Sequence, residues 1–289
     1  MLALPQAIEH NHAIDRRRFL TASTATAVCS SAWAHPHHQT KTGNANPQPR
    51  VVKVILQGGP SQIDLWDMKP NARSDIRGSF QPIRTNVTGI QISEILPCIA
   101  TMMDQFTIVR SITGSAGSHN LIQAETGFPA DVRHPSQQRN HSNAAQLASP
   151  RYASTFSHVK SLLQDGHANI VLRFGHWDHH QQLAPAIKQI AGQFDQQFVR
   201  LIGSLSNTGL LEQTTILVWA EFGRSPYINA AGGRDHWPAI NSAFIAGGPV
   251  SRGNVWGATS ADGSHITDAP IRMNELLQQC HQSATACLT

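Results

Sequence analysis

The stretch VVKVILQGGP, residues 51–60, carries the clearest strand signal in the chain. Residues 51–56 are apolar apart from Lys53, and a Gly-Gly-Pro turn at 58–60 ends the run. A short apolar run that stops at turn residues is typical of a buried strand. Residues 51–56 are therefore expected to form the first strand of the core.

Four further strands are expected to alternate with helices along the rest of the chain. The longest helix carries apolar residues at three- and four-residue spacing, which is typical of an amphipathic helix. Strand–helix alternation predicts an α/β fold with a mostly parallel sheet flanked by helices. The strands 51–56, 170–174 and 214–219 are expected to pair, because each carries its own apolar run. The other expected strands are 106–109 and 243–245, and the expected helices are 94–104, 154–164, 183–205 and 273–280.

Polar clusters follow four of these strands. In an open α/β sheet, sites form where the carboxyl ends of parallel strands meet. Each cluster contains Asp, Glu or His, which are the ligands of zinc and similar divalent ions. The third and fourth clusters are expected to converge through Asp178, His180, Asp235 and His236, with Asp64 and His119 approaching the same pocket. These residues predict a metal site, and a structural hydrogen-bond network is the alternative.

Two arginines of the fourth cluster, Arg224 and Arg234, are the candidates for binding an anion. A guanidinium can hold an anionic oxygen through a bidentate contact. Both arginines are therefore predicted to take part in catalysis.

The composition argues against several other classes of protein. The chain has 289 residues, a formal net charge of +4, and many turn residues, with 21 Gly and 16 Pro. A low share of charged residues and many turn residues argue against a coiled coil. No basic stripe with interleaved aromatic residues occurs, so no nucleic-acid partner is expected. The 16 His, against 18 Asp and Glu, favour a metal-binding protein.

The N-terminus predicts an export signal. The sequence RRRFL at 16–20 resembles the core of a twin-arginine signal, and AWA at 32–34 resembles a cleavage site. We expect residues 1–34 to be a signal peptide cleaved near Ala34, with the twin-arginine export machinery as partner and a periplasmic or extracellular destination. The apolar run at 20–32 is too short to span a bilayer, so no stable membrane anchor is expected. An amphipathic N-terminal helix is the alternative.

The rest of the chain is expected to form one domain, 50–289, after a disordered linker at 35–49. Residues 127–152 are polar and lack periodicity, which predicts an irregular, exposed and mobile insert.

Three cysteines remain after the expected signal: Cys98, Cys280 and Cys287. An odd count leaves at least one unpaired. Cys280 and Cys287 could pair, although their spacing alone does not show it.

Several long motifs resemble one known family. They are GGPSQIDLWDMKPNARSDIRGSFQPI at 58–83, VRSIT at 109–113, HWDHHQQLAPAIKQIAGQFDQQFVRLIGSL at 176–205, GLLEQTTILVWAEFGRSPYINAAGGRDHWP at 209–238 and AGGPVSRGNVWGATSADG at 246–263. Together they resemble the domain of unknown function 1501 family over about 50–126 and 157–263. Its members are exported bacterial proteins distantly similar to sulfatases and alkaline phosphatases.

The resemblance implies an alkaline-phosphatase-like core in which post-strand Asp and His side chains hold one or two divalent metals, zinc or similar. Such a metal acts as a Lewis acid on an anionic ester substrate. Ser61 is the candidate nucleophile, and Ser111, Thr113 and Ser118 compete with it. By motif position, the candidate ligands are Asp64, His119, Asp178, His180, Glu221, Asp235 and His236.

Three departures from the superfamily pattern bear on activity. Gln57 stands where the superfamily has an Asp, and the motifs WDHH and GRDHW echo its later metal motifs only loosely. The family's long central section is compressed into residues 127–156. We therefore expect a fold that is incomplete in the middle, a wide and wet pocket, and feeble or absent ester hydrolysis.

Two functions follow from these observations. The first is an exported metal-dependent hydrolase of phosphate or sulfate esters. The alternative is a non-catalytic or decayed family member with a binding or envelope-structural role. Bound metal with ester turnover separates them.

Overall fold

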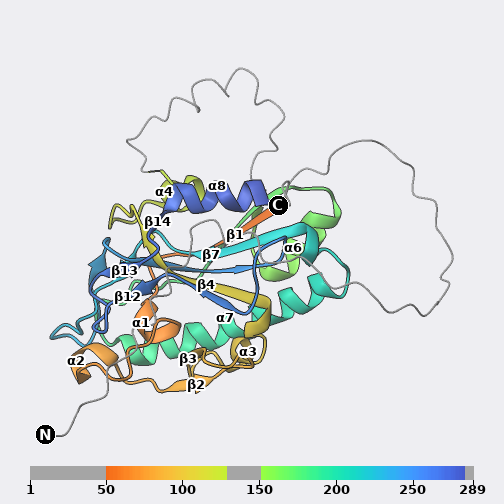
Figure 1. The fold of residues 1–289 in the computed structure, drawn as a ribbon. Helices are drawn as coiled ribbons and strands as arrows, with labels where there is room; N and C mark the ends of the chain where they lie inside the picture. Colours follow the sequence, from red (N-terminus) through yellow and green to blue (C-terminus); the bar gives the residue numbers. More distant parts are fainter. Residues whose placement is uncertain (1–49, 129–150, 284–289) are drawn as a thin grey trace, which may run out of the picture.

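The computed structural model describes residues 50–128 and 151–283, which form a sheet between two layers of helices (Figure 1). The expected signal peptide and linker, most of the expected insert, and Cys287 lie outside the described residues. Within the described ranges, no helix combines the length and apolar character needed to cross a membrane.

The central sheet of the described residues has eight strands, in the order β11-β4-β10-β7-β1-β6-β5, with β14 also pairing with β4. Strand β1 is parallel to β6 and β7, while β10 is antiparallel to both of its neighbours. The mostly parallel α/β fold and the pairing of the three core strands are thus confirmed. The bounds are β1 Arg50–Leu56, β4 Phe106–Thr113, β5 Arg151–Ala153, β6 Asn169–Phe174, β7 Thr214–Trp219, β10 Asn241–Ala246, β11 Asn254–Trp256 and β14 Ile271–Arg272.

The central strand β1 shows why the apolar runs become strands. Val52, Val54 and Leu56 pack into the core on one face of the sheet, and Ile55 packs into the core on the other. Lys53 is buried and its ammonium donates to the carbonyl of Glu125 at 2.8 Å. Burial on both faces requires an almost continuous apolar run, which is the pattern that the sequence shows.

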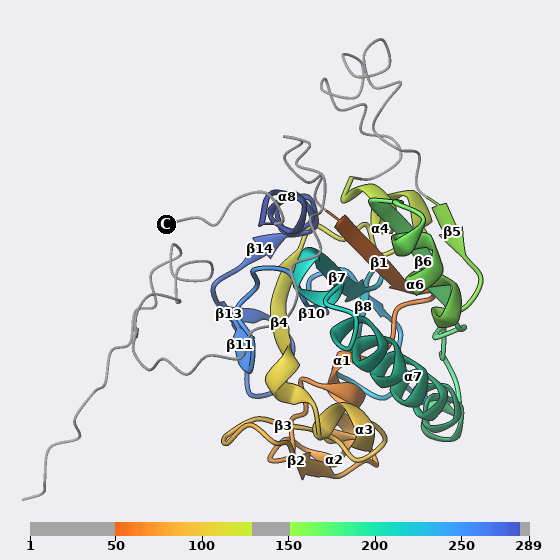
Figure 2. The same cartoon turned by 90° about the vertical axis from the view of Figure 1, so that its right-hand side faces the viewer.

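Helices cover both faces of the sheet (Figures 1 and 2). The long helix α7 packs on one face through residues that include Phe194 and Phe198, whose rings stack at 5.1 Å. The first layer is α3 Pro97–Ala100, α6 Phe156–Gln164 and α7 Leu183–Ser206, and the second is α4 Leu121–Thr126 and α8 Met273–Ser283. The remaining short elements are α1 Gln62–Leu65, α2 Ser74–Arg77, β2 Pro82–Arg84, β3 Gln91–Ser93, η2 Met103–Gln105, η3 Leu211–Gln213, β8 Gly223–Arg224, β9 His236–Trp237, β12 Ala258–Thr259 and β13 Ile266–Asp268.

Two expectations for local structure are wrong. The helix expected at 94–104 is only α3 followed by the 3₁₀ turn η2, because Pro97 restricts the backbone of the residue before it and so delays the start. The expected insert also ends earlier than predicted, because Arg151–Ala153 forms the edge strand β5 beside β6.

Candidate metal centre

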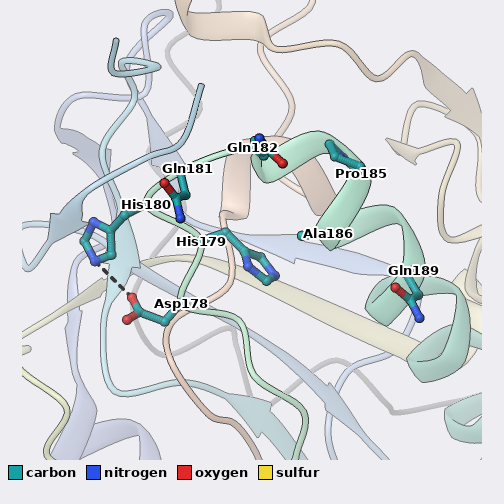
Figure 3. Close-up of a pocket in the computed structure, with 8 residues that line it drawn as sticks. All are labelled: Asp178, His179, His180, Gln181, Gln182, Pro185, Ala186 and Gln189. Atoms are coloured by element: carbon teal, nitrogen blue, oxygen red, sulfur yellow. Dashed lines mark ion pairs between the residues drawn. The ribbon is translucent and has the colours of Figure 1, made fainter. Parts of the chain in front are cut away.

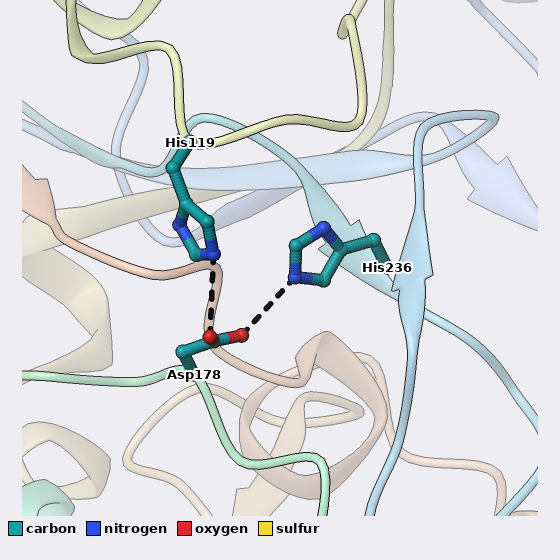
Figure 4. Close-up of side chains that lie close together, drawn as sticks. All are labelled: His119, Asp178 and His236. Atoms are coloured by element: carbon teal, nitrogen blue, oxygen red, sulfur yellow. Dashed lines mark hydrogen bonds and ion pairs between the residues drawn. The ribbon is translucent and has the colours of Figure 1, made fainter.

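Three side chains from separate segments meet beyond the carboxyl ends of the parallel strands. His119 follows β4, Asp178 follows β6, and His236 lies in β9 after β7 (Figure 4). The Nε2 atom of His119 lies 3.2 Å from one carboxylate oxygen of Asp178, and Nε2 of His236 lies 3.1 Å from the other. One donor atom from each residue lies within 4.8 Å of the other two. The three residues therefore form a candidate metal centre.

The partners of two imidazoles orient them toward this centre. The Nδ1 atom of His236 lies 2.9 Å from the carbonyl oxygen of Gly117, and Nδ1 of His180 lies 2.7 Å from Asp235. Because a carbonyl or carboxylate oxygen accepts, each Nδ1 donates, and in a neutral ring of this tautomer the Nε2 lone pair is free to bind a metal. The ring of Phe222 stacks on His236 at 4.0 Å and helps to fix its plane.

The Nε2 atoms and the Asp178 carboxylate lie against a positive charge, because Nη1 of Arg224 is 3.5 Å from Nε2 of His180 and Nη2 pairs with Asp178. The two Nε2 atoms of His180 and His236 are 3.1 Å apart, and each lies 3.1 Å from the same oxygen of Asp178. A proton or a metal ion between the two nitrogens would satisfy both. Imidazole nitrogens and a carboxylate oxygen, as in His119, Asp178 and His236, are a ligand set of a divalent metal such as zinc.

Asp178 is held as an anion. Burial alone would raise its pKa, but hydrogen bonds from Arg224 and His236, and the charge of Arg224, lower it to about 2. The carboxylate is therefore ionised at any working pH and needs no proton loss to bind a cation.

The guanidinium of Arg224 bonds to groups inside the protein rather than to an external anion. Its side chain is fully buried, and Nε donates to Gly59 O at 2.7 Å, Nη1 to Arg234 O at 2.8 Å and Nη2 to Gly58 O at 2.5 Å. Nη2 also pairs with Asp178. Its donors are thus committed to three loops, which differs from the predicted role of holding substrate.

Arg234 and Asp64 form a buried ion pair. Nε of Arg234 donates to Asp64 at 2.7 Å, and the same guanidinium donates to Ile76 O at 2.7 Å. Ser61 donates its hydroxyl hydrogen to Asp64 at 2.5 Å and caps helix α1. The structure thus places Asp64, Ser61 and Arg234 in an internal network, because a tertiary contact between residues 170 positions apart satisfies them.

Glu221 follows β7 and lies against the glycine turn at Gly58. Its carboxylate accepts from the backbone N–H of Gly58 at 3.1 Å, and burial raises its pKa. Gly58 and Gly59 have positive φ angles, and a Cβ on Gly59 would lie 2.5 Å from the Phe222 ring. The glycine turn therefore lets the first loop pack closely against the other two.

The hydroxyl groups of the other candidate nucleophiles, Ser111, Thr113 and Ser118, differ in their exposure to solvent. Ser111 is buried and donates to Ala269 O at 2.6 Å, and Thr113 bonds to Ile271 O at 3.4 Å. Ser118 is exposed and directly precedes His119.

Sequence reasoning missed three contributors. Gly117 and Phe222 hold His236, and the amide of Asn229 donates to Asp235 at 3.2 Å. Phe222 lies inside the cluster after β7 and could have been considered, but the Gly117 carbonyl and Asn229 carry no signal in the sequence.

Comparisons with known proteins give one family and several similar folds. The family described as "Protein of unknown function (DUF1501)" matches residues 48–158 and 136–286. No curated protein matches the chain in sequence.

Three of the solved structures that are similar to this one are as follows. The soluble domain of lipooligosaccharide phosphoethanolamine transferase A from Neisseria meningitidis is 12% identical over 71% of this chain and 79% of that chain, with a TM-score of 0.41. The C-terminal periplasmic domain of EcEptC from Escherichia coli, in complex with Zn, is 10% identical over 84% and 83%, with a TM-score of 0.48. Murine ectonucleotide pyrophosphatase/phosphodiesterase 5 is 11% identical over 84% and 96%, with a TM-score of 0.43.

Proposed function

The chain belongs to the DUF1501 family, and we propose that it is an exported, metal-dependent hydrolase of phosphate or sulfate esters. The observation that carries this proposal is the cluster of His119, Asp178 and His236 at the edge of the sheet, with Nε2 of His180 3.1 Å from Nε2 of His236 and 3.1 Å from Asp178.

His119, Asp178 and His236 would hold the metal, with His180 beside them. The mixed nitrogen and oxygen donors favour zinc or a similar ion. When bound, a divalent metal supplies the positive charge that polarises an anionic ester group.

Residues around the centre orient the side chains that would bind the metal. Arg224 fixes the carboxylate of Asp178, and Asp235 directs Nε2 of His180 toward the bound group. Ser118 is the exposed hydroxyl beside a ligand, so it is our candidate nucleophile, and water is the alternative.

The site is open to solvent, which predicts slow turnover. The side chains of His119 and Asp178 are 49% and 37% exposed. Water around the reacting group weakens the electrostatic help that a closed site gives to a charged transition state.

One observation favours a second function, metal binding without catalysis. Arg224 and Arg234 are both buried and internally bonded, so neither is free to neutralise an ester. Under this alternative the family fold is kept for a binding or envelope-structural role.

The test uses the exported chain purified from the periplasm. Its metal content is measured by elemental analysis, and its turnover of aryl phosphate and aryl sulfate esters is measured with and without a chelator. We expect bound metal and slow, chelator-sensitive turnover that His236→Gln abolishes and His265→Gln, at an exposed histidine outside the site, leaves unchanged. Metal without turnover supports the binding role instead, and absence of metal contradicts both.

A further inference from the structure

A hollow opens directly beside the candidate metal centre. It has a volume of about 420 Å³, and Asp178 and His180 form part of its wall. The rest of the wall comes from the loop after β6 and the first turns of α7 (Figure 3). This volume lies within the range of small-molecule sites, about 300–1,000 Å³.

The wall away from the metal centre is neutral and rich in amides. Gln181, Gln182 and Gln189 line it, and no hydrogen bond joins their side chains to another described residue. Each amide offers a carbonyl acceptor and two N–H donors. Pro185 and Ala186 add a small apolar surface between them.

The residue types that do not occur among the described lining residues indicate which class of ligand fits the hollow. Lys and Arg do not occur among the lining residues, so the hollow has no cation for a second phosphate group. Phe, Tyr and Trp do not occur there either, so among the described lining residues the aromatic rings are the imidazoles of His179 and His180. A ligand with several neutral hydroxyl groups matches the amide donors and acceptors and the small apolar surface of this wall.

Two residues of the wall have unusual local structure, one in its backbone and one in its hydrogen bonding. Gln182 adopts the left-handed conformation, with φ at +46°, and its N–H donates to Ala231 O at 3.1 Å. His179 has a buried Nε2 atom that has no hydrogen-bond partner among the described residues. A strained backbone and an unsatisfied polar atom both occur preferentially at binding sites.

We infer that the hollow binds the alcohol half of the ester as a neutral, polyhydroxylated group, a sugar ring. The ester group itself would then lie at the metal centre, so this inference rests on the proposed function for that half of the substrate. The glutamine amides would bind the ring hydroxyls.

The test compares ligands that share the ester and differ in the alcohol. Binding of galactose 6-sulfate and phenyl sulfate to the zinc-loaded exported protein is measured by calorimetry. We expect the double variant Gln181→Ala/Gln189→Ala to bind galactose 6-sulfate about tenfold more weakly, because two hydrogen bonds are lost. Its affinity for phenyl sulfate should be unchanged. Gln193→Ala, an exposed glutamine of α7 outside the hollow, should change neither.

A neutral probe separates this inference from the proposed function. Methyl galactoside should give saturation-transfer NMR signals with the wild-type protein and lose them with the double variant. Sugar binding without turnover of any ester would keep the inference and overturn the hydrolase. Turnover of aryl esters, together with sugar binding that is the same in the double variant and the wild type, would overturn the inference and keep the hydrolase. Absence of all binding would overturn both.

Discussion

Replacing Arg224 with Lys should destabilise the protein through lost hydrogen bonds in its interior. The guanidinium donates to the carbonyls of Gly58, Gly59 and Arg234 and pairs with Asp178. A lysine ammonium is a point charge that cannot reach acceptors on all sides of a planar fork. If two bonds are lost, each worth about 1.5–3 kcal/mol because the donor is charged, the free energy of unfolding falls by about 3 kcal/mol or more.

The assay is urea unfolding followed by circular dichroism, in chelator so that metal binding does not contribute. Arg77→Lys is the matched control, because Arg77 is exposed, and it should change the unfolding free energy by less than about 0.5 kcal/mol. The reasoning would be refuted if the two variants unfolded at the same urea concentration with the same slope.

Three further predictions address export, acid stability and the nucleophile. Replacing Arg16 and Arg17 with Lys should leave precursor in the cytoplasm, and normal trimming of this variant on an immunoblot would contradict the twin-arginine interpretation. Burial lowers the pKa of His281 to about 4, so the unfolded chain binds the extra proton and stability falls by up to about 3 kcal/mol as pH drops from 6.5 to 4. His281→Leu should lose that part of the acid sensitivity in urea unfolding at pH 7 and 4.5, and an unchanged pH dependence would contradict the assignment. Ser61→Ala should cost about 1 kcal/mol of stability as a lost helix cap, whereas Ser118→Ala should remove ester turnover without changing stability; full activity in Ser118→Ala would point to water as the nucleophile.

The main strands could be predicted because their residues are buried on both faces. Such strands read as apolar runs, and Arg50–Leu56, Asn169–Phe174 and Thr214–Trp219 all do so. A strand was expected at 243–245 and forms the longer Asn241–Ala246. Its antiparallel direction was not expected, since direction depends on the path of the connections. Short strands such as Asn254–Trp256 have no run long enough to give a pattern.

The candidate site was predictable to the extent that strand ends meet at one edge. That rule led us to expect Asp178, His180, Asp235 and His236 in one pocket, with Asp64 and His119 approaching it. The structure brings His119, Asp178 and His236 within 4.8 Å of one another. It could not show that Asp64 and Arg234 satisfy each other in the interior, because a buried ion pair and a ligand look alike in sequence.

Zinc titration of the metal-stripped exported protein tests the metal centre most directly. We predict one strong site in the wild type, weakened at least about 100-fold in Asp178→Asn and unchanged in Asp75→Asn, whose carboxylate pairs only with the exposed Arg73 among the described residues. Circular dichroism checks that each variant is folded. Equal zinc affinity in Asp178→Asn and the wild type, or no zinc binding by either, would contradict the account.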